Sequence, residues 1–404
     1  MTEETAGYTT KAECARPRAQ QWEGGNEPGN TWWRHSIRTM LRPGRAHSTV
    51  AYPATLTVNI SMTPKLLMVC LLLTGTVPNF LAAAQDAGAA DWVNISDPVI
   101  AAVTNAGTKI PWPGGTAGVA VDRTTDALFL CLPNLGLWKS TDHGTNFIRV
   151  AAGEVSGRSV SGYSMNCDPA SSRMACLLLE GKSGMTLDGT HWQAFASVGR
   201  NWEYGAVDWS DPQARTIFAD RHESGGEKYL STNAGASWQL LGQHPEFASL
   251  GVFDARTLVA GRADGIVRST DGGATWTKIS DLHPVGRIAV YFQGLTYWLA
   301  KEGLITSADK GATWQTMGTA VNAQWGPLFG HDEKHIVVAN YTSFLQTTDG
   351  GKTWARIAPM IPFKGEWVPR LPGQYLNIGW DPDANILYAS QLGWPTYRLQ
   401  LTAP

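Results

Sequence analysis

The chain has 404 residues and a formal net charge of −2, and 16% of its residues are charged. This balance excludes recognition of nucleic acid or of an anionic membrane through a general basic surface. The sequence contains 43 glycines and 18 tryptophans, a composition typical of all-β repeat proteins.

The first part of the chain lies outside any repeat pattern. Residues 1–61 have no periodic apolar residues, and we expect them to be disordered or to come from an over-extended gene model. Residues 62–84 combine Lys65, a short apolar run and small residues at the end, which is typical of a secretory signal peptide. We therefore expect a secreted protein, extracellular or periplasmic. A short membrane anchor behind a disordered tail is the alternative.

An eight-residue motif recurs downstream. It has a hydroxyl residue first, Asp or Asn third, Gly fifth and an aromatic residue last, at Ser140–Phe147, Ser231–Trp238, Ser269–Trp276, Ser307–Trp314 and Thr347–Trp354. A shortened copy is Leu187–Trp192, and successive closing aromatics lie 38 to 46 residues apart. Asp or Asn followed by Gly favours a tight turn between two strands. A period near forty predicts stacked four-stranded units.

The motif resembles the Asp-box, or BNR repeat, of sialidase-like β-propellers, and the resemblance covers residues 90–403. It implies a propeller in which each box joins the third and the outermost strand of a blade, on the face opposite the usual ligand site. We therefore expect the aspartates of the boxes to form turns rather than to bind metal or catalyse.

Residues 86–404 are predicted to form an all-β, seven-bladed propeller. The blades are expected to begin near Gly118, Tyr163, Tyr204, Leu250, Ile288, Gly326 and Leu376. The last unit ends one strand short, at 395–400, whereas 90–96 resembles the outer strand at 274–280. We expect this N-terminal strand to complete the last blade and close the ring.

Three cysteines lie within the predicted propeller. Cys167 and Cys176 flank a turn and are expected on neighbouring strands, so we predict a disulfide between them in the secreted protein. Cys131 is then a buried thiol.

The face opposite the boxes receives the segments that enter each blade and the loops between second and third strands. Candidate substrate-binding residues there are Arg158, Tyr163, Lys182, Arg287, Trp325, Tyr375 and Trp394. Aromatic rings stack on sugars, and Arg or Lys pairs with carboxylates, so this composition suits a carbohydrate, particularly an acidic one. Polar and aromatic residues are also common in loops without any ligand.

The catalytic candidates are Glu203, Tyr204, Arg221 and His222, because the loop after Asp220 carries an insertion at 224–227. Histidine exchanges protons near neutral pH. A solvated polar loop is the alternative interpretation.

The family contains sialidases, other glycoside hydrolases, polysaccharide lyases, lectins and assembly factors. Its sialidases carry Arg-Ile-Pro where this chain has Lys109-Ile110-Pro111, which argues against sialidase activity. We expect a secreted carbohydrate-active enzyme that cleaves glycosidic bonds of a polysaccharide or oligosaccharide, uronate-containing ones included.

Two mechanisms remain open. Hydrolysis would pair Glu203 with Glu180, Glu223 or Glu366, whereas β-elimination would use Arg221, His222 and Tyr204. A non-catalytic sugar-binding propeller and an assembly factor are the alternative functions. We expect a monomer with no cofactor, no metal, no nucleic-acid partner and no membrane contact once the signal is removed.

Overall fold

The computed structural model describes residues 91–361 and 376–402. The predicted leader regions 1–61 and 62–84, and the rim candidates Glu366 and Tyr375, lie outside the described residues.

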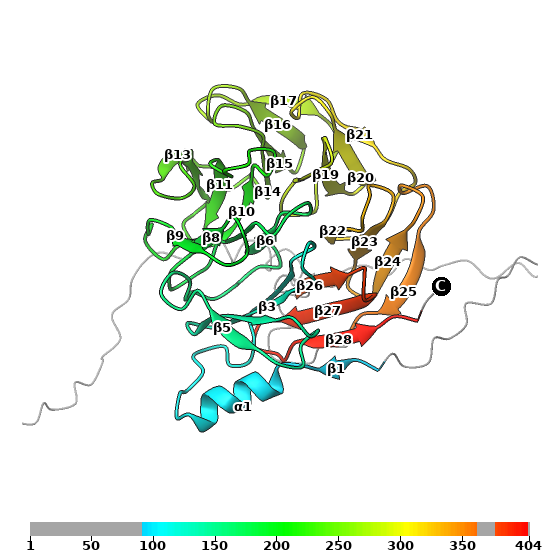
Figure 1. The fold of residues 1–404 in the computed structure, drawn as a ribbon. Helices are drawn as coiled ribbons and strands as arrows, with labels where there is room; N and C mark the ends of the chain where they lie inside the picture. The colour runs from blue at the N-terminus through cyan, green and yellow to red at the C-terminus, as the bar shows by residue number, and fades with distance from the viewer. Residues whose placement is uncertain (1–90, 362–375, 403–404) are drawn as a thin grey trace, which may run out of the picture. The chain divides into compact units, whose positions relative to one another are not determined.

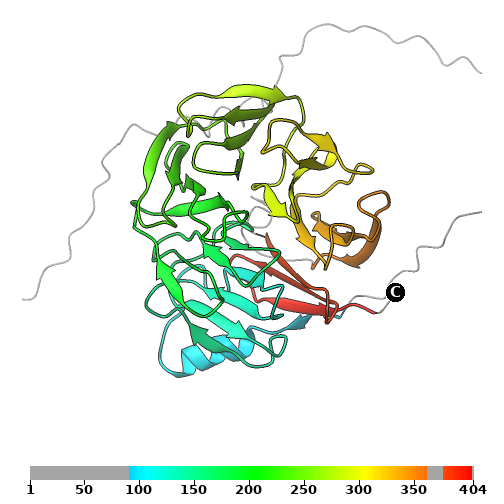
Figure 2. The same ribbon diagram turned by 45° about the horizontal axis from the view of Figure 1, so that its top comes forward.

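The described chain forms seven four-stranded antiparallel sheets around a common axis (Figures 1 and 2). The first three blades contain β2 (Gly118–Val121), β3 (Leu128–Leu132), β4 (Gly136–Ser140) and β5 (Ile148–Val150); β6 (Met165–Cys167), β7 (Met174–Cys176), β8 (Gly184–Thr186) and β9 (Trp192–Ala194); and β10 (Trp202–Val207), β11 (Ile217–Arg221), β12 (Glu227–Ser231) and β13 (Gln239–Gln243).

Blades four to six contain β14 (Ser249–Val252), β15 (Leu258–Arg262), β16 (Gly265–Ser269) and β17 (Thr277–Ser280); β18 (Val290–Phe292), β19 (Leu295–Ala300), β20 (Gly303–Ser307) and β21 (Gln315–Thr316); and β22 (Trp325–Phe329), β23 (Ile336–Ala339), β24 (Ser343–Thr347) and β25 (Ala355–Pro359). Blade seven contains β26 (Leu376–Asp381), β27 (Ile386–Gln391), β28 (Tyr397–Gln400) and β1 (Val93–Asn94). The seven-bladed fold is confirmed, and each first strand begins within two residues of its predicted start.

The ring is closed by the pairing of β1 with β28, as predicted. Val93 lies opposite Arg398, and Asn94 lies opposite Tyr397. The indole Nε1 of Trp92 also donates to the Pro359 carbonyl at 3.3 Å, which ties the first described residues to blade six. Because the last blade acquires its fourth strand from the other end of the chain, chain ends do not leave an incomplete sheet at the junction.

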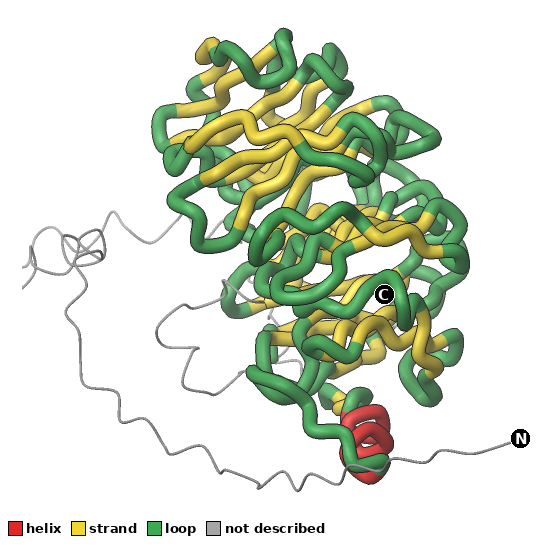
Figure 3. Tube along the Cα trace, turned by 90° about the vertical axis from the view of Figure 1, so that its left-hand side faces the viewer, coloured by secondary structure: helices red, strands yellow, loops and turns green. Residues whose placement is uncertain are grey.

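A helix that the sequence reading did not anticipate follows the closing strand. Helix α1 (Asp97–Asn105) lies outside the ring (Figures 1 and 3). Its Val99 and Val103 are buried in a cluster with Leu130 and Tyr388. The strand is short because Asn94 Oδ1 accepts the backbone N–H of Ser96 at 3.0 Å and turns the chain. The helix thus covers the junction of blades one and seven.

The repeated motifs form the turns between third and fourth strands, and their hydrogen bonds recur. In one copy Ser269 Oγ donates to Asp271 Oδ1 at 2.7 Å and accepts from Gly273 N–H at 2.8 Å. Asp271 Oδ1 also accepts the N–H of Thr275 at 2.9 Å. Equivalent bonds occur at Ser140, Ser231, Ser307 and Thr347. The acidic side chains of these box turns are therefore engaged in closing the turn.

The predicted disulfide is wrong. Strands β6 and β7 pair Met165 with Cys176 and Cys167 with Met174, and both cysteines are free thiols. This register sets the two cysteines diagonally, and diagonal neighbours on an antiparallel pair are about 7–8 Å apart, beyond the reach of a disulfide. Cys131 is a buried thiol, as predicted, and burial raises its pKa to about 12.

Among the described residues, no helix is long and apolar enough to span a membrane.

Ser269→Ala should destabilise the protein by about 1–3 kcal/mol, because it leaves the buried N–H of Gly273 without an acceptor. Thr277→Ala, at an exposed position on β17 of the same hairpin, is the control and should stay within about 0.5 kcal/mol. Urea unfolding measures both. An equal effect of the two substitutions would contradict the role assigned to the serine.

Candidate functional site

Antiparallel pairing separates the connections of each blade between two ends of the ring. The turns between first and second strands share one end with the box turns, and we call this end the box face. The segments that enter each blade and the loops between second and third strands lie at the other end, which we call the entry rim. All candidate site residues predicted from the sequence and described by the structure belong to entry-rim segments or to the strand ends that adjoin them.

A series of contacting side chains, all ionisable except one tryptophan, crosses the entry rim from blade one to blade three. We call it the rim network, and its members are Trp112, Arg158, Glu180, Arg200, Glu203, His222 and Glu223. It joins five residues singled out from the sequence to Trp112 and Arg200, which sequence reasoning missed. The five are Arg158, Glu180, Glu203, His222 and Glu223.

Arg158 forms the buried end of the rim network. Its Nε and Nη2 donate to Glu180 Oε2 at 3.1 and 2.9 Å, and its guanidinium lies 4.5 Å from the centre of the Trp112 ring. Trp112 comes from the segment that enters blade one, and it is 54% exposed. A large aromatic surface is thus held at the rim by a buried arginine.

Arg200 continues the rim network toward blade three. Its Nη2 donates to Glu180 Oε1 at 2.5 Å, and its Nη1 lies 3.6 Å from Glu223 Oε2. The hydrogen bond from Arg200 is the main cause that lowers the pKa of Glu180 below its ordinary value of 4.5, and the hydrogen bond from Arg158 adds to it against the opposing effect of burial. Glu180 is therefore a carboxylate shared by two arginines.

His222 and Glu203 lie together at the far end of the rim network. His222 Nδ1 is 3.2 Å from Glu203 Oε2, and its Nε2 is 3.7 Å from Glu223 Oε1. The imidazole is mostly buried, and two carboxylates flank its two nitrogens. Similar pairs of a histidine with an acid occur elsewhere, for example His283 with Glu302 at 2.8 Å. The pair alone therefore does not identify a catalytic site.

The other two catalytic candidates are engaged in structural contacts. Tyr204 is fully buried, and its hydroxyl donates to the Ala248 carbonyl at 3.0 Å, at the entry to blade four. Burial raises the pKa of Tyr204 well above its ordinary value of 10, so its proton is held tightly. Arg221 Nη1 donates to Glu227 Oε2 at 2.6 Å within its own blade, while its Nε is buried without a partner among the described residues.

The remaining binding candidates divide between the axis and the rim. Tyr163 donates its hydroxyl to the Gln324 carbonyl at 2.5 Å, and Trp325 is almost completely buried with its ring edge-on to Tyr341 at 5.0 Å. Arg287 lies over the Tyr204 ring at 5.2 Å. Lys182 is exposed and donates to the Gly153 carbonyl, and Trp394 is half-buried beside Thr116. Tyr163 and Arg287 are therefore engaged in contacts with other blades.

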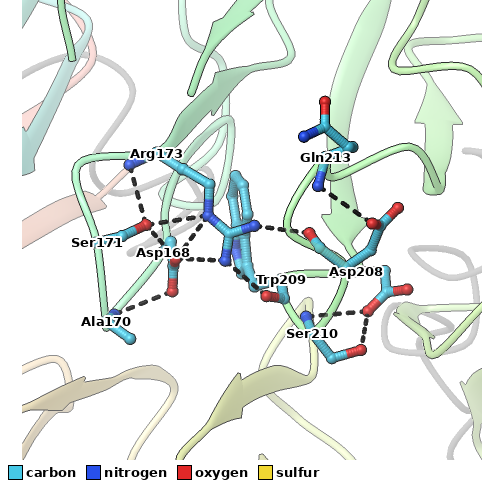
Figure 4. Close-up of polar contacts among 9 residues, drawn as sticks. Asp168, Ala170, Ser171, Arg173, Asp208, Trp209, Ser210 and Gln213 are labelled. Atoms are coloured by element: carbon cyan, nitrogen blue, oxygen red, sulfur yellow. Dashed lines mark hydrogen bonds and ion pairs between the residues drawn. The ribbon is translucent and has the colours of Figure 1, made fainter. Parts of the chain in front are cut away.

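The box face is held together by backbone-directed contacts of its own. Arg173 donates to Asp168 Oδ2 at 2.6 Å and to the carbonyls of Asp211 and Trp209, each at 2.6 Å (Figure 4). Its guanidinium also lies 5.3 Å from the Trp209 ring centre. Arg173 thereby clamps blade two to blade three. Among the described residues, no three His, Cys, Asp or Glu side chains are arranged to hold a metal ion.

No protein-family model matches the chain, and no curated protein matches it. Similar solved structures include YCF48 bound to D1 peptide, with 16% identity, a TM-score of 0.40, and coverage of 73% of this chain and 94% of that chain. They also include YCF48 from Cyanidioschyzon merolae, with 13% identity, a TM-score of 0.39, and coverage of 72% and 97%. The GH74 enzyme of Niastella koreensis has 14% identity and a TM-score of 0.26, with coverage of 71% and 64%.

Glu180→Gln should destabilise the protein by about 1–2 kcal/mol at pH 7, because it leaves the buried Arg158 without its carboxylate while solvent screens part of the loss. The lowered pKa means that the carboxylate stabilises the fold above pH 4.5 and that this contribution disappears as the pH falls through the folded pKa. The difference from the parent should therefore shrink in acid. Asp264→Asn, in the exposed pair with Arg262, is the control and should leave the free energy of unfolding almost unchanged.

Proposed function

We propose that this protein is an exported, divergent member of the sialidase-like propellers and binds a neutral saccharide across the rim network. The observation that carries the proposal is Trp112, an exposed indole fixed over Arg158 at the rim. The recurring box turns support the family relationship, and the signal peptide predicted at 62–84 supports export.

The chemistry of the rim network suits a sugar. Indole rings stack on the apolar faces of pyranose rings, while carboxylates and guanidinium groups exchange hydrogen bonds with hydroxyls. Arg200 and Glu223 are both well exposed and come from blade three, whereas Trp112 comes from the entry to blade one. A saccharide stacked on Trp112 and extending toward blade three would therefore meet the polar side chains of Arg200 and Glu223.

The charges of the rim network favour a neutral sugar over the acidic one considered from the sequence. Two arginines there face the three carboxylates of Glu180, Glu203 and Glu223. Arg158, a candidate for pairing with a uronate, already pairs with Glu180, and Arg221 already pairs with Glu227. A uronate would have to displace these internal partners.

Trp112→Ala should weaken saccharide binding about ten-fold, the size expected from loss of one aromatic stacking contact. The measurement is calorimetric titration with the best neutral ligand found on an array of plant, algal and microbial oligosaccharides. Trp112→Phe should recover most of the affinity. Leu240→Ala removes a similarly exposed apolar side chain from β13 and should leave binding unchanged. Equal affinity of the parent and the Trp112→Ala variant would contradict the proposal.

Cleavage of the bound sugar is a second candidate function, favoured by the contact between His222 and Glu203. β-Elimination fits less well than hydrolysis, because two of the residues that it would use are engaged in other contacts. Tyr204 is buried, and Arg221 is paired with Glu227. In hydrolysis an acid group would donate its proton to the glycosidic oxygen, and a base would accept a proton from the attacking water. Glu203 and Glu223, on the two sides of His222, are the groups able to share these roles.

If the protein cleaves its ligand, Glu203→Gln should reduce turnover about 10²- to 10⁴-fold while preserving binding. Release of reducing sugar measures turnover, and calorimetric titration measures binding. Glu246→Gln, which removes the carboxylate of another His–Glu pair, is the control. A parent protein that binds the saccharide without releasing reducing sugar would exclude cleavage and retain the binding function.

A further inference from the structure

A cavity of about 100 Å³ lies on the axis of the ring, apart from the rim network. The first strands of six blades, or the residues next to them, form its wall, which is mainly apolar and includes Val119, Val121, Val207, Ile288, Val290 and Ile378. In other proteins an apolar cavity of about 150 Å³ binds benzene. The volume here suits a short alkyl chain or a partly inserted ring.

The end of the cavity toward the entry rim is narrowed by close contacts. A Cβ on Gly162 would lie 2.0 Å from the Leu376 carbonyl oxygen, which shows that blades two and seven approach closely there. The Tyr163 hydroxyl donates to the Gln324 carbonyl at 2.5 Å and links blade two to blade six. Gly162 and Tyr163 both line the cavity. Access from the entry rim is therefore obstructed.

The end of the cavity toward the box face is open to solvent. It is lined by residues that follow or end the first strands, namely Arg123, Pro169, Trp209, Phe329 and Trp380. Arg123 and Pro169 are only half-buried, so solvent reaches this end. The contacts of Arg173 with Asp168 and Trp209 brace the same edge (Figure 4). The cavity is thus a pocket with a rigid mouth on the box face.

Arg123 supplies the positive charge at this mouth. Its Nε donates to the Phe329 carbonyl at 2.8 Å, while its Nη1 is buried without an acceptor. Among the described residues it forms no ion pair within 4.0 Å. Of the nearby carboxylates, Asp383 Oδ1 is hydrogen-bonded to His331 Nε2 at 2.6 Å, whereas Asp381 Oδ2 lies 3.2 Å from His143 Nδ1 without forming a hydrogen bond.

Asp126, the third nearby acid, has its pKa raised, first by burial and then by Asp381 and Asp383. Burial is the main cause that lowers the pKa of Arg123, and four acids, Asp383, Asp126, Asp381 and Asp122, oppose this effect from beyond ion-pair distance. The Nη1 donor of Arg123 thus has no acceptor among the described residues. A carboxylate is the group that best satisfies a guanidinium, through two parallel hydrogen bonds.

We propose that this axial pocket binds a small organic acid from the box face, with its apolar body among the first strands and its carboxylate on Arg123. The site is independent of saccharide binding at the rim, because Gly162 and Tyr163 lie between the two. The ligand class is a short aliphatic or monocyclic aromatic carboxylic acid.

Hexanoate is the probe, and hexanol is its uncharged counterpart. Calorimetric titration of the full-length protein should give saturable one-site binding of hexanoate and weaker binding of hexanol. Arg123→Gln should weaken hexanoate binding about ten- to a hundred-fold, as expected for loss of a charged hydrogen-bond pair. Arg268→Gln is the matched control, since Arg268 likewise donates to one backbone carbonyl, that of Lys310, and has no ion pair within the described chain; it should bind as the parent does.

Val290→Phe fills the wall of the pocket and should abolish binding of both probes, provided that the variant keeps a cooperative thermal transition. A crystal structure with hexanoate should place its carboxylate at Arg123. The proposal is overturned if millimolar hexanoate gives no saturable binding, if Arg123→Gln binds as the parent does, or if the pocket of the soaked crystal contains ordered water alone.

Discussion

Alternation of strand direction within each four-stranded blade is the constraint on which the rest of the structure depends. In the first six blades it sends the first and third connections to one end of the ring and the second connection, with the entry to the next blade, to the other. The serine–aspartate–glycine turns at one end use their polar groups to satisfy the backbone, as in Ser269 and Gly273. The entry segments obey no such repeated requirement, and their side chains differ from blade to blade.

The strand pattern was accessible to sequence reasoning because it is local and repeated. Asp or Asn followed by Gly marks each box turn, and alternating apolar residues mark the strands beside it, so the blade starts could be placed closely. The closure was also predictable, since 90–96 resembles the outer strand at 274–280. Helix α1 was missed because Asn94 ends the strand through a hydrogen bond within a few residues, whereas the resemblance suggested that the strand continued.

The arrangement of the site was less predictable because its contacts join distant residues. Glu180 binds Arg158 and Arg200, which lie 22 and 20 positions away, and no spacing rule connects them. The burial of Tyr204 depends on blade four packing against blade three, and the sequence alone carries no sign of it. The cysteine error has the same origin, because adjacent strands could be predicted but not the register that sets Cys167 diagonal to Cys176.

The carboxylate partners of the arginines distinguish the two ends of the molecule. At the rim, Arg158 and Arg221 have carboxylate partners, so a ligand there is recognised best by exposed aromatic surface and by hydroxyl-compatible polar groups. At the box face, Asp383 is hydrogen-bonded to His331, and Arg123 has no carboxylate within ion-pair distance in the described chain. The ligands that we propose for the two ends therefore differ in character, a neutral saccharide at the rim and an apolar acid at the box face. Because Tyr163 and Gly162 narrow the axis between the two proposed sites, we expect the two ligands to bind without competing.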